Sequence, residues 1–447
     1  MSVGRGTPYL VRMRSLEEMA STLVSEEFRA FLRERVYIAG LRLLWERHRL
    51  KPSFPFPDTK FNPNTGVSYP ESSYNVLYTW VLGRGLEACV AHIKLLKETQ
   101  TADDLNQIKG MLQKFIHSLT EALLQILEVN GGRCPFMVDR GFHAVDGKGK
   151  RVAVNTRERG PADLFCAKGL LASGQGKAMK VGKELLKEFI QASFSGRYLP
   201  DTPGAGPGDY TPFMLALGGI PLALGCAEDA AEERFWGREL AHLLEHLFVS
   251  FYDSNRSLLH SPGDPTVNPG HALEAVGLGL RAIEAARKSE AASESLGEEV
   301  ERALREFPWL CLKTFAWGYN RIYGGIFQSV NIVRGVVVNP HMPWWSLPEA
   351  ARAAIRAASV AEDKRIFVGL LEATCTALNA YFSFYLNPEL LFFPFQTRDG
   401  RTGKVVDVHP AIPEGDPLYH ANLSFLDMEK VLASPQWVRK AGSLSEG

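Results

Sequence analysis

A histidine and a glutamate stand one helical turn apart where the chain enters a predicted helix. In the stretch Asn-Pro-Gly-His-Ala-Leu-Glu, Pro269 and Gly270 set the chain entry, and His271 shares a helix face with Glu274, three residues on. A carboxylate fixes the tautomer of a neighbouring histidine, and a free histidine titrates near neutral pH. The spacing therefore predicts that His271 is a general base. The plainer alternative is a histidine at a helix N-terminus beside a capping acid.

Three further segments add aromatic and charged side chains. Trp345 and Glu349 belong to Trp-Trp-Ser-Leu-Pro-Glu-Ala, Trp80 and Arg84 to Trp-Val-Leu-Gly-Arg, and His420 ends the last long loop. An arginine inside an apolar helix needs a carboxylate or a polar ligand as its partner. Aromatic faces that stack on sugars and charged donors that bind hydroxyls are the components of a carbohydrate site. Each residue alone is better explained by core packing or helix capping, but their joint occurrence indicates such a site.

Helical periodicity dominates the rest of the chain. Apolar residues recur every three or four positions, and Ser25 followed by two glutamates is typical of a helix start. No long strand is predicted. The predicted helices span residues 25–50, 74–99, 102–129, 161–173, 181–192, 210–224, 230–251, 269–287, 297–315, 346–358 and 363–385.

The links between these helices alternate in kind. Short polar links, such as residues 98–104 and 227–232, contrast with long links that are rich in Gly, Pro, Asp and aromatic residues and resemble small hairpins. The long links are residues 54–73, 131–155, 253–268, 317–343 and 387–419. This alternation predicts helical hairpins in a ring, with the functional residues at the end that carries the long links. We therefore expect one all-α domain over residues 1–447.

The order of the motifs is WxxGR, NPGHxxEA, a Gly-Gly hairpin, WWxxxEA and a C-terminal Tyr-His, and it resembles the N-acylglucosamine 2-epimerase superfamily. That family includes renin-binding-protein-like epimerases, mannose isomerases and cellobiose 2-epimerases. The resemblance implies an all-α (α/α)6 toroid with short β-hairpin loops at one end. It implies catalytic roles for His271 and His420 in a cofactor-independent and metal-independent sugar 2-epimerase or aldose–ketose isomerase. The implied substrate-binding residues are Arg84, Trp80, Glu274, Glu349 and Trp345.

The chain also departs from the family pattern. His420 is followed by Ala421-Asn422-Leu423 where the family usually has Pro-Arg, and residues 162–171 lack a histidine that the isomerase branches carry. Two alternatives therefore stay open. One is a hydrolase or lyase on the same toroid, with Glu274 and Glu349 as paired carboxylates. The other is a non-catalytic sugar-binding relative.

Charge and composition bear on partners and location. The 50 basic and 50 acidic side chains give a formal net charge of zero, so nothing predicts binding to nucleic acid or to an anionic membrane. The six cysteines form no Cys-x-x-Cys pair, and the N-terminal segment lacks the apolar core of a secretory signal. We expect a cytoplasmic enzyme with reduced thiols that acts on a small-molecule sugar; a homodimer is the assembly to test for.

Two other motifs are weaker. His242, Glu245 and His246 have the His-x-x-Glu-His spacing of inverted zinc proteases, but the segment continues as an ordinary amphipathic helix, which favours a solvated helix face. The Gly-rich residues 204–209 lack the Lys-Ser/Thr of a phosphate loop and follow no predicted strand.

Overall fold

The computed structural model describes residues 11, 13–98, 103–200, 209–409 and 412–442. The Gly-rich segment lies outside these residues except for Asp209. The chain folds as two compact units: residues 1–40, 237–410 and 420–447 form the first, and residues 41–236 and 411–419 form the second. The expectation of a single domain stays a prediction.

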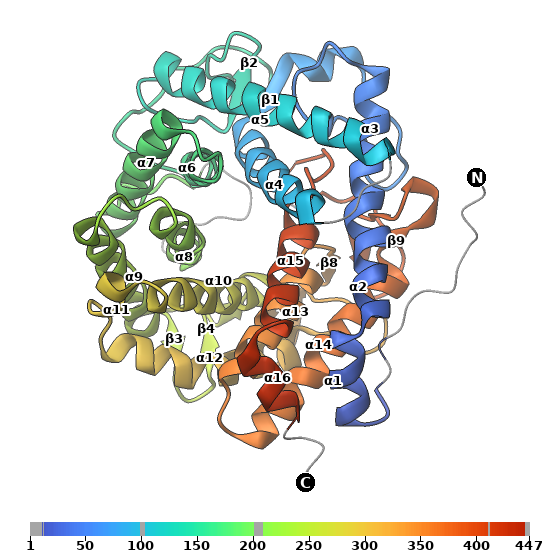
Figure 1. Ribbon diagram of the computed structural model, residues 1–447, viewed down its shortest axis with the longest axis vertical. Helices are drawn as coiled ribbons and strands as arrows, with labels where there is room; N and C mark the ends of the chain where they lie inside the picture. The colour runs from blue at the N-terminus through green and yellow to red at the C-terminus, as the bar shows by residue number, and fades with distance from the viewer. Residues whose placement is uncertain (1–10, 12, 99–102, 201–208, 410–411, 443–447) are drawn as a thin grey trace. The chain divides into compact units, whose positions relative to one another are not determined.

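Figure 1 labels the helices of the second unit. Along the chain of this unit, helices that bury most of their length alternate with amphipathic helices. Its helices are α3 (Ala39–Leu50), α4 (Thr79–Glu98), α5 (Asp103–Val129), α6 (Pro161–Ala172), α7 (Gly176–Phe194), α8 (Thr211–Leu224) and the start of α9 (Ala230–Ser250). α6 and α8 bury almost every residue, whereas α7 buries one face. The backbones of α4 and α6 are in close contact, which only glycine allows. A side chain on Gly83 would overlap the carbonyl oxygen of Phe165, and one on Gly169 would overlap the backbone of Gly83.

α13 is the helix around which much of the first unit packs, because it contacts α10, α12, α14 and α15. Its sequence is rich in alanine, whose small side chain allows neighbouring helices to approach, and almost all of α13 is buried. The helices of this unit are α1 (Leu16–Val24), α2 (Glu26–Leu32), the π-helical turn η1 (Arg33–Ile38), α10 (Pro269–Arg287), α11 (Glu290–Ser293), α12 (Glu298–Gly318), α13 (Ser346–Val360), α14 (Lys364–Phe384), α15 (His420–Leu432) and α16 (Pro435–Gly442).

Short antiparallel strands lie in or next to the long links. Three of the pairs below are hairpins within one link, as the sequence predicted, and the other three join two different segments. The pairs are β1 (Val76–Tyr78) with β2 (Met137–Asp139), β3 (Tyr252–Asp253) with β4 (Leu258–Leu259), β5 (Thr266–Val267) with β6 (Ser329–Asn331), β6 with β7 (Val336–Asn339), β8 (His341–Pro343) with β11 (Thr397–Asp399), and β9 (Leu386–Asn387) with β10 (Phe393–Pro394). Two 3-10 turns, η2 (Glu71–Asn75) and η3 (Pro388–Leu390), precede β1 and β10.

The helix predictions are confirmed apart from two segments. Residues 25–50 fold as α2, η1 and α3 in place of one regular helix, and the helix predicted from residue 74 starts at Thr79 because residues 76–78 pair with β2. None of the six cysteines forms a disulfide, and all but Cys226 are buried.

α14 is long and apolar enough to span a membrane by length and composition, but 67% of its most apolar stretch is buried inside the protein. The core helix of a soluble protein has these same properties.

Candidate functional site

His420 and Glu349 form a buried hydrogen-bonded pair in the first unit. His420 is the first residue of α15 and Glu349 lies in the first turn of α13. Nδ1 of His420 lies 3.1 Å from Oε1 of Glu349, and the same oxygen accepts a hydrogen bond from the Ser424 hydroxyl at 3.1 Å. When Nδ1 carries the proton and donates to Glu349, Nε2 is the nitrogen that accepts a proton. This is the arrangement of an oriented general base.

The second oxygen of Glu349 is also occupied. Arg352, one helical turn further along α13, forms an ion pair with Oε2. Burial alone would raise the pKa of Glu349, but the charge of Arg352 and the hydrogen bonds from His420 and Ser424 hold that pKa below its usual value. Glu349 is therefore a carboxylate at neutral pH, with both oxygens engaged.

Trp345 lies next to both predicted bases. The centroid of its ring is 5.4 Å from that of His271 and 5.5 Å from that of His420, and the planes are tilted by 32° in each case. A side chain at Gly270 would come within 2.7 Å of the Trp345 ring, so glycine is needed for this close approach of α10. The Asn268 side chain caps α10 by accepting a hydrogen bond from the backbone N–H of His271 at 3.2 Å.

Glu274 completes the cluster. It is buried, and one side-chain ligand atom of each of Glu274, Glu349 and His420 lies within 4.8 Å of the others. Three such groups could hold a metal ion by distance alone. The oxygens of Glu349 already accept from His420, Ser424 and Arg352, however, so the arrangement suits hydrogen bonding and proton transfer better than metal coordination.

Aromatic rings hold Arg84 in the second unit. Its guanidinium carbon lies 4.3 Å from the ring centroid of Trp80, 4.1 Å from that of Phe165 and 5.2 Å from that of Tyr419. All three distances are within the range of cation–π attraction. The close packing of α4 and α6 at Gly83 places Phe165 against Arg84. The sequence placed Trp80 beside Arg84 and predicted a carboxylate or polar ligand as a further partner, but it did not anticipate the rings of Phe165 and Tyr419.

Lys168 and Tyr419 form a second polar contact beside Arg84. The Lys168 ammonium contacts the Tyr419 hydroxyl and lies 3.3 Å from a carboxylate oxygen of Glu87, and Lys168 is buried. Sequence analysis missed Lys168, although a lysine in the apolar helix α6 was a usable signal. The backbone N–H of Tyr419 donates to the Asp416 carboxylate, and Leu418 adopts a left-handed conformation with φ 64°. This turn sets the direction of Tyr419 at the start of α15.

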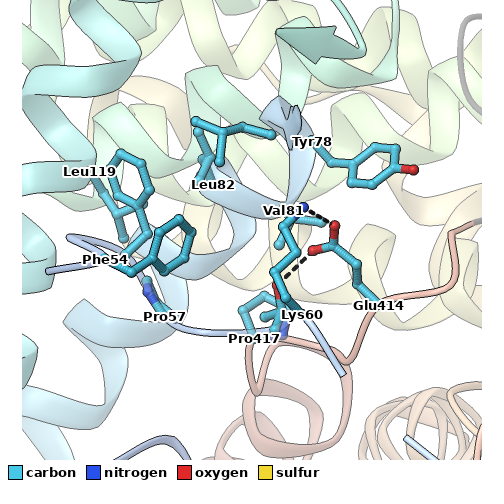
Figure 2. A pocket seen from close by; sticks show the side chains of 12 residues that line it. Phe54, Pro57, Lys60, Tyr78, Val81, Leu82, Leu119, Glu414 and Pro417 are labelled. Atoms are coloured by element: carbon cyan, nitrogen blue, oxygen red, sulfur yellow. Dashed lines mark hydrogen bonds and ion pairs between the residues drawn. The ribbon is translucent and has the colours of Figure 1, made fainter. Parts of the chain in front are cut away.

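A pocket elsewhere in the second unit is lined mainly by apolar side chains, among them Phe54, Val81 and Leu119 (Figure 2). Lys60 and Glu414 meet at its side as a buried ion pair, and Lys60 also donates to the carbonyl of Val76 at 2.7 Å. These two charges satisfy one another, which fits a role in holding residues 412–419 to the unit.

The structure brings five of the seven predicted site residues together in the first unit: His271, Glu274, Trp345, Glu349 and His420. Trp80 and Arg84 contact one another in the second unit. That all seven belong to one site, with the assigned roles, stays a prediction. Sequence analysis missed Arg352 and Ser424, although they stand one turn after Glu349 and His420.

The His-x-x-Glu-His motif has no third ligand nearby in the part of the chain that the structure describes. His246 lies on α9, where its Nδ1 is 3.3 Å from the Ser250 hydroxyl. Among the described residues, no third metal-ligating side chain joins His242 and His246 in a cluster.

Comparisons with known proteins identify the fold. No protein-family model matches the chain, and no relative was found among curated proteins by sequence. A cellobiose 2-epimerase from Spirochaeta thermophila is similar in structure, with 14% identity, a TM-score of 0.61, and coverage of 93% of this chain and 97% of that one. A D-mannose isomerase gives 14% identity, a TM-score of 0.62, and coverage of 91% and 99%.

A cellobiose 2-epimerase from Bacillus thermoamylovorans gives 14% identity, a TM-score of 0.60, and coverage of 87% and 98%. These likenesses extend over most of both chains in every case. They confirm the predicted fold class, an all-α toroid of helical hairpins. The chain has the fold of these cellobiose 2-epimerases and of this D-mannose isomerase, the kinds of enzyme that the order of its sequence motifs resembled.

Proposed function

We propose that the protein is a sugar epimerase or isomerase that moves the proton at C2 of a free aldose or an N-acylhexosamine. The observation that carries the proposal is the His420–Glu349 pair, with His271 beside the same Trp345 ring. Two imidazoles near one flat aromatic surface suit two proton transfers on a sugar. The likeness of the fold to epimerases and an isomerase supports this class of reaction.

The reaction begins with a sugar whose ring has opened. One histidine takes the proton from C2, and the electron pair of that C–H bond moves toward C1 and its carbonyl oxygen, which gives an enediolate with its charge on O1. Return of a proton to the opposite face of C2 from the other histidine restores the C1 carbonyl and inverts C2. Transfer of the O2 proton to O1, with a proton returned to C1, gives the ketose instead. Neither route changes the oxidation state overall, so the proposal needs no redox cofactor.

The remaining residues would bind and orient the sugar. Glu349 holds the tautomer of His420, Glu274 is placed to accept from hydroxyls, and Trp345 offers a stacking face. We assign Arg84 to the oxyanion that develops at C1, with Trp80 beside it. Tyr419, which contacts Arg84, is followed directly in the chain by His420, and this continuity supports their joint assignment.

The state of Glu349 argues against a glycoside hydrolase. A hydrolase needs one carboxyl group as a proton donor with a raised pKa and another that can attack or activate water. Glu349 has a lowered pKa and both its oxygens are engaged, so it suits neither role.

Hydrogen exchange tests the proposal. The purified protein is incubated in deuterium oxide with free aldoses, N-acetylhexosamines and β-linked disaccharides, and loss of the C2 proton signal is followed by NMR. An epimerase or isomerase introduces deuterium at C2 or C1, a hydrolase cleaves the disaccharide, and a binding protein does neither. The last two outcomes would reject the proposal.

Variants of the two histidines assign the roles. His271→Ala and His420→Ala should each abolish epimerisation, whereas one of them can still exchange C2 with solvent, because a single base removes and returns a proton on one face. His117→Ala, an exposed histidine on α5, is the matched control and should leave the rate unchanged.

The proposal extends to location and partners. A sugar enzyme whose six cysteines form no disulfide would suit the reducing cytoplasm. Its partner would be a small-molecule sugar, and size-exclusion chromatography with light scattering would decide between monomer and homodimer.

A further inference from the structure

Three helices of the first unit carry polar side chains at matching helical spacing. On α13 these are Glu349, Arg352 and Arg356, all buried. On α15 they are His420, Ser424 and Asp427, also buried. α10 adds Glu274, Arg281 and Glu284. Intervals of three, four and seven residues put each set on one helix face. Together the three faces form one polar seam, which is buried along α13 and α15 and reaches solvent at Arg281 and Glu284.

The two ends of this seam are differently bonded. At one end Glu349 accepts from His420 and Ser424. At the other end Arg356 makes a bidentate contact with Asp427, at 2.7 and 2.6 Å, and a third contact with Glu284 at 2.7 Å. Charge-assisted contacts of this kind are short and directional. They fix α13 against α10 and α15.

Arg352 lies between the two ends. It forms an ion pair with Glu349. Burial alone would raise the pKa of Asp427, but Arg356, and to a smaller extent Arg281 and Arg352, hold that pKa well below its usual value. Its Nε is buried without a hydrogen-bond partner among the described residues. A side chain on Gly277 would come within 2.9 Å of this nitrogen, so α10 makes room for the guanidinium by having glycine there.

A buried N–H without a partner is unfavourable, because it has lost its hydrogen bonds to water. The ion pair with Glu349 offsets that cost, which ties the location of Arg352 to Glu349. Given the proposed function, on which this inference rests, we propose that Arg352 is a positioning residue for proton transfer. It keeps Glu349 charged and turned toward His420, and so fixes the His420 tautomer with a proton on Nδ1.

The charges around the pair are few. Glu274 faces it from α10, Arg352 from α13 and Asp427 from α15, one turn beyond Ser424. α12 and α14, which also pack on α13 and are described in full, bury no charged side chain. Arg352 is thus the cation in direct contact with the Glu349–His420 pair within this unit.

Removal of the positive charge of Arg352 should shift the pH dependence of the reaction in one direction. In the wild type, the positive charge of Arg352 favours release of the proton shared by Glu349 and His420. Without Arg352 these two residues should therefore keep that proton up to a higher pH. In Arg352→Met the acid limb of the kcat/KM profile for C2 exchange should move up by about one pH unit, while KM stays near the wild-type value. Arg352→Lys keeps the charge and should keep the wild-type limb.

The controls separate positioning from simple destabilisation. Arg287→Met removes an exposed arginine that pairs with Glu301 on the surface, and it should change neither rate nor pH profile. If Arg352→Met does not fold, Arg352→Gln is measured by the same criterion. A folded Arg352→Met or Arg352→Gln protein with an unmoved acid limb would overturn the inference, and so would a Lys variant that shifts as the neutral variant does.

A second measurement needs no substrate. With ¹⁵N-histidine labelling, and His420→Gln to assign the signal, NMR reports the tautomer and the titration of His420. We expect Nδ1–H in the wild type and titration at higher pH in Arg352→Met. Unchanged titration would overturn the inference even if the enzyme is active. Absence of C2 exchange with a shifted titration would reject the proposed function and leave the role of Arg352 supported.

Discussion

Glu349 and Glu414 are both buried glutamates paired with a cation, one in each unit, yet their pKa values move in opposite directions. Burial dominates for Glu414 and raises its pKa, with Lys60 and Thr59 opposing and Asp58 adding to the rise. Burial also acts on Glu349, but Arg352, His420 and Ser424 together lower its pKa. A single paired cation therefore does not by itself lower the pKa of a buried carboxylate. For Glu349, the charge of Arg352 and the hydrogen bonds from His420 and Ser424 together outweigh burial.

The comparison separates two uses of a buried ion pair. The Lys60–Glu414 pair joins residues 412–419 to the rest of the second unit (Figure 2). The hydrogen bond between Glu349 and His420 joins α13 to α15 and also fixes which ring nitrogen of His420 carries the proton. Four predictions test this distinction.

The largest effect is expected for Glu349→Gln. An amide would turn its oxygen to Arg352 and its NH₂ to His420, which forces the proton of the imidazole onto Nε2. We expect kcat/KM for C2 exchange to fall at least about 100-fold, as orienting carboxylates show elsewhere. Steady-state kinetics and the ¹⁵N spectrum of His420 measure the two effects. A variant with near wild-type turnover would show that Glu349 does not orient the base.

A smaller loss is expected for Arg84→Lys. A lysine keeps the charge but has no planar group to stack on Trp80, Phe165 and Tyr419. The fold should survive, with kcat/KM lower by about tenfold. Arg140→Lys, an exposed arginine over the single ring of Phe54, is the matched control and should be silent. Equal rates for the wild type and Arg84→Lys would make Arg84 a structural residue.

Glu414→Gln should affect stability and leave catalysis intact. It leaves Lys60 buried with a neutral partner, at a cost of about 1–3 kcal/mol in the free energy of unfolding. Turnover should stay within about twofold of the wild type, since this pair belongs to the packing of residues 412–419. Urea unfolding and initial rates give both quantities. A large loss of turnover at unchanged stability would place Glu414 in the functional site.

The subtlest test compares the two Gln variants across pH. The lowered pKa of Glu349 means that its contribution to stability is present above the usual glutamate pKa and is lost as the pH falls through the folded value. The raised pKa of Glu414 means that its contribution is fully present below the usual pKa and is lost as the pH rises through the folded value. In the acid range, the difference in unfolding free energy between the wild type and each variant should therefore change with pH in opposite directions for Glu349→Gln and Glu414→Gln. Parallel slopes would remove the distinction.

Much of the fold could be predicted because helical periodicity is a local signal. α10, α13 and α14 start where Pro269, Ser346 and the cap Asp363 indicate. The π-helical turn at residues 33–38 could not be predicted, since its apolar spacing still fits an ordinary helix.

The sequence predicted part of the candidate site. It missed the residues whose burial depends on how distant helices pack. Arg352 and Arg356 lie in an alanine-rich segment, where charged residues usually mark a solvent-exposed face. Only the packing of α10 and α15 against α13 makes them buried and paired. The rings around Arg84 come from segments as distant as Phe165 and Tyr419, and no local pattern connects these to residue 84.

The polar seam has a consequence for the order in which the chain is made. α13 ends at Val360 and α15 begins at His420, so about 60 residues, or roughly 3–12 s of synthesis, separate them on the ribosome. During that interval Glu349 and Arg356 have no His420 or Asp427 to contact. A helix with such charges cannot be buried until its partners arrive, so α13 stays accessible to water or to a chaperone. The part of the chain that would hold the catalytic base is thus also the part that allows the first unit to close.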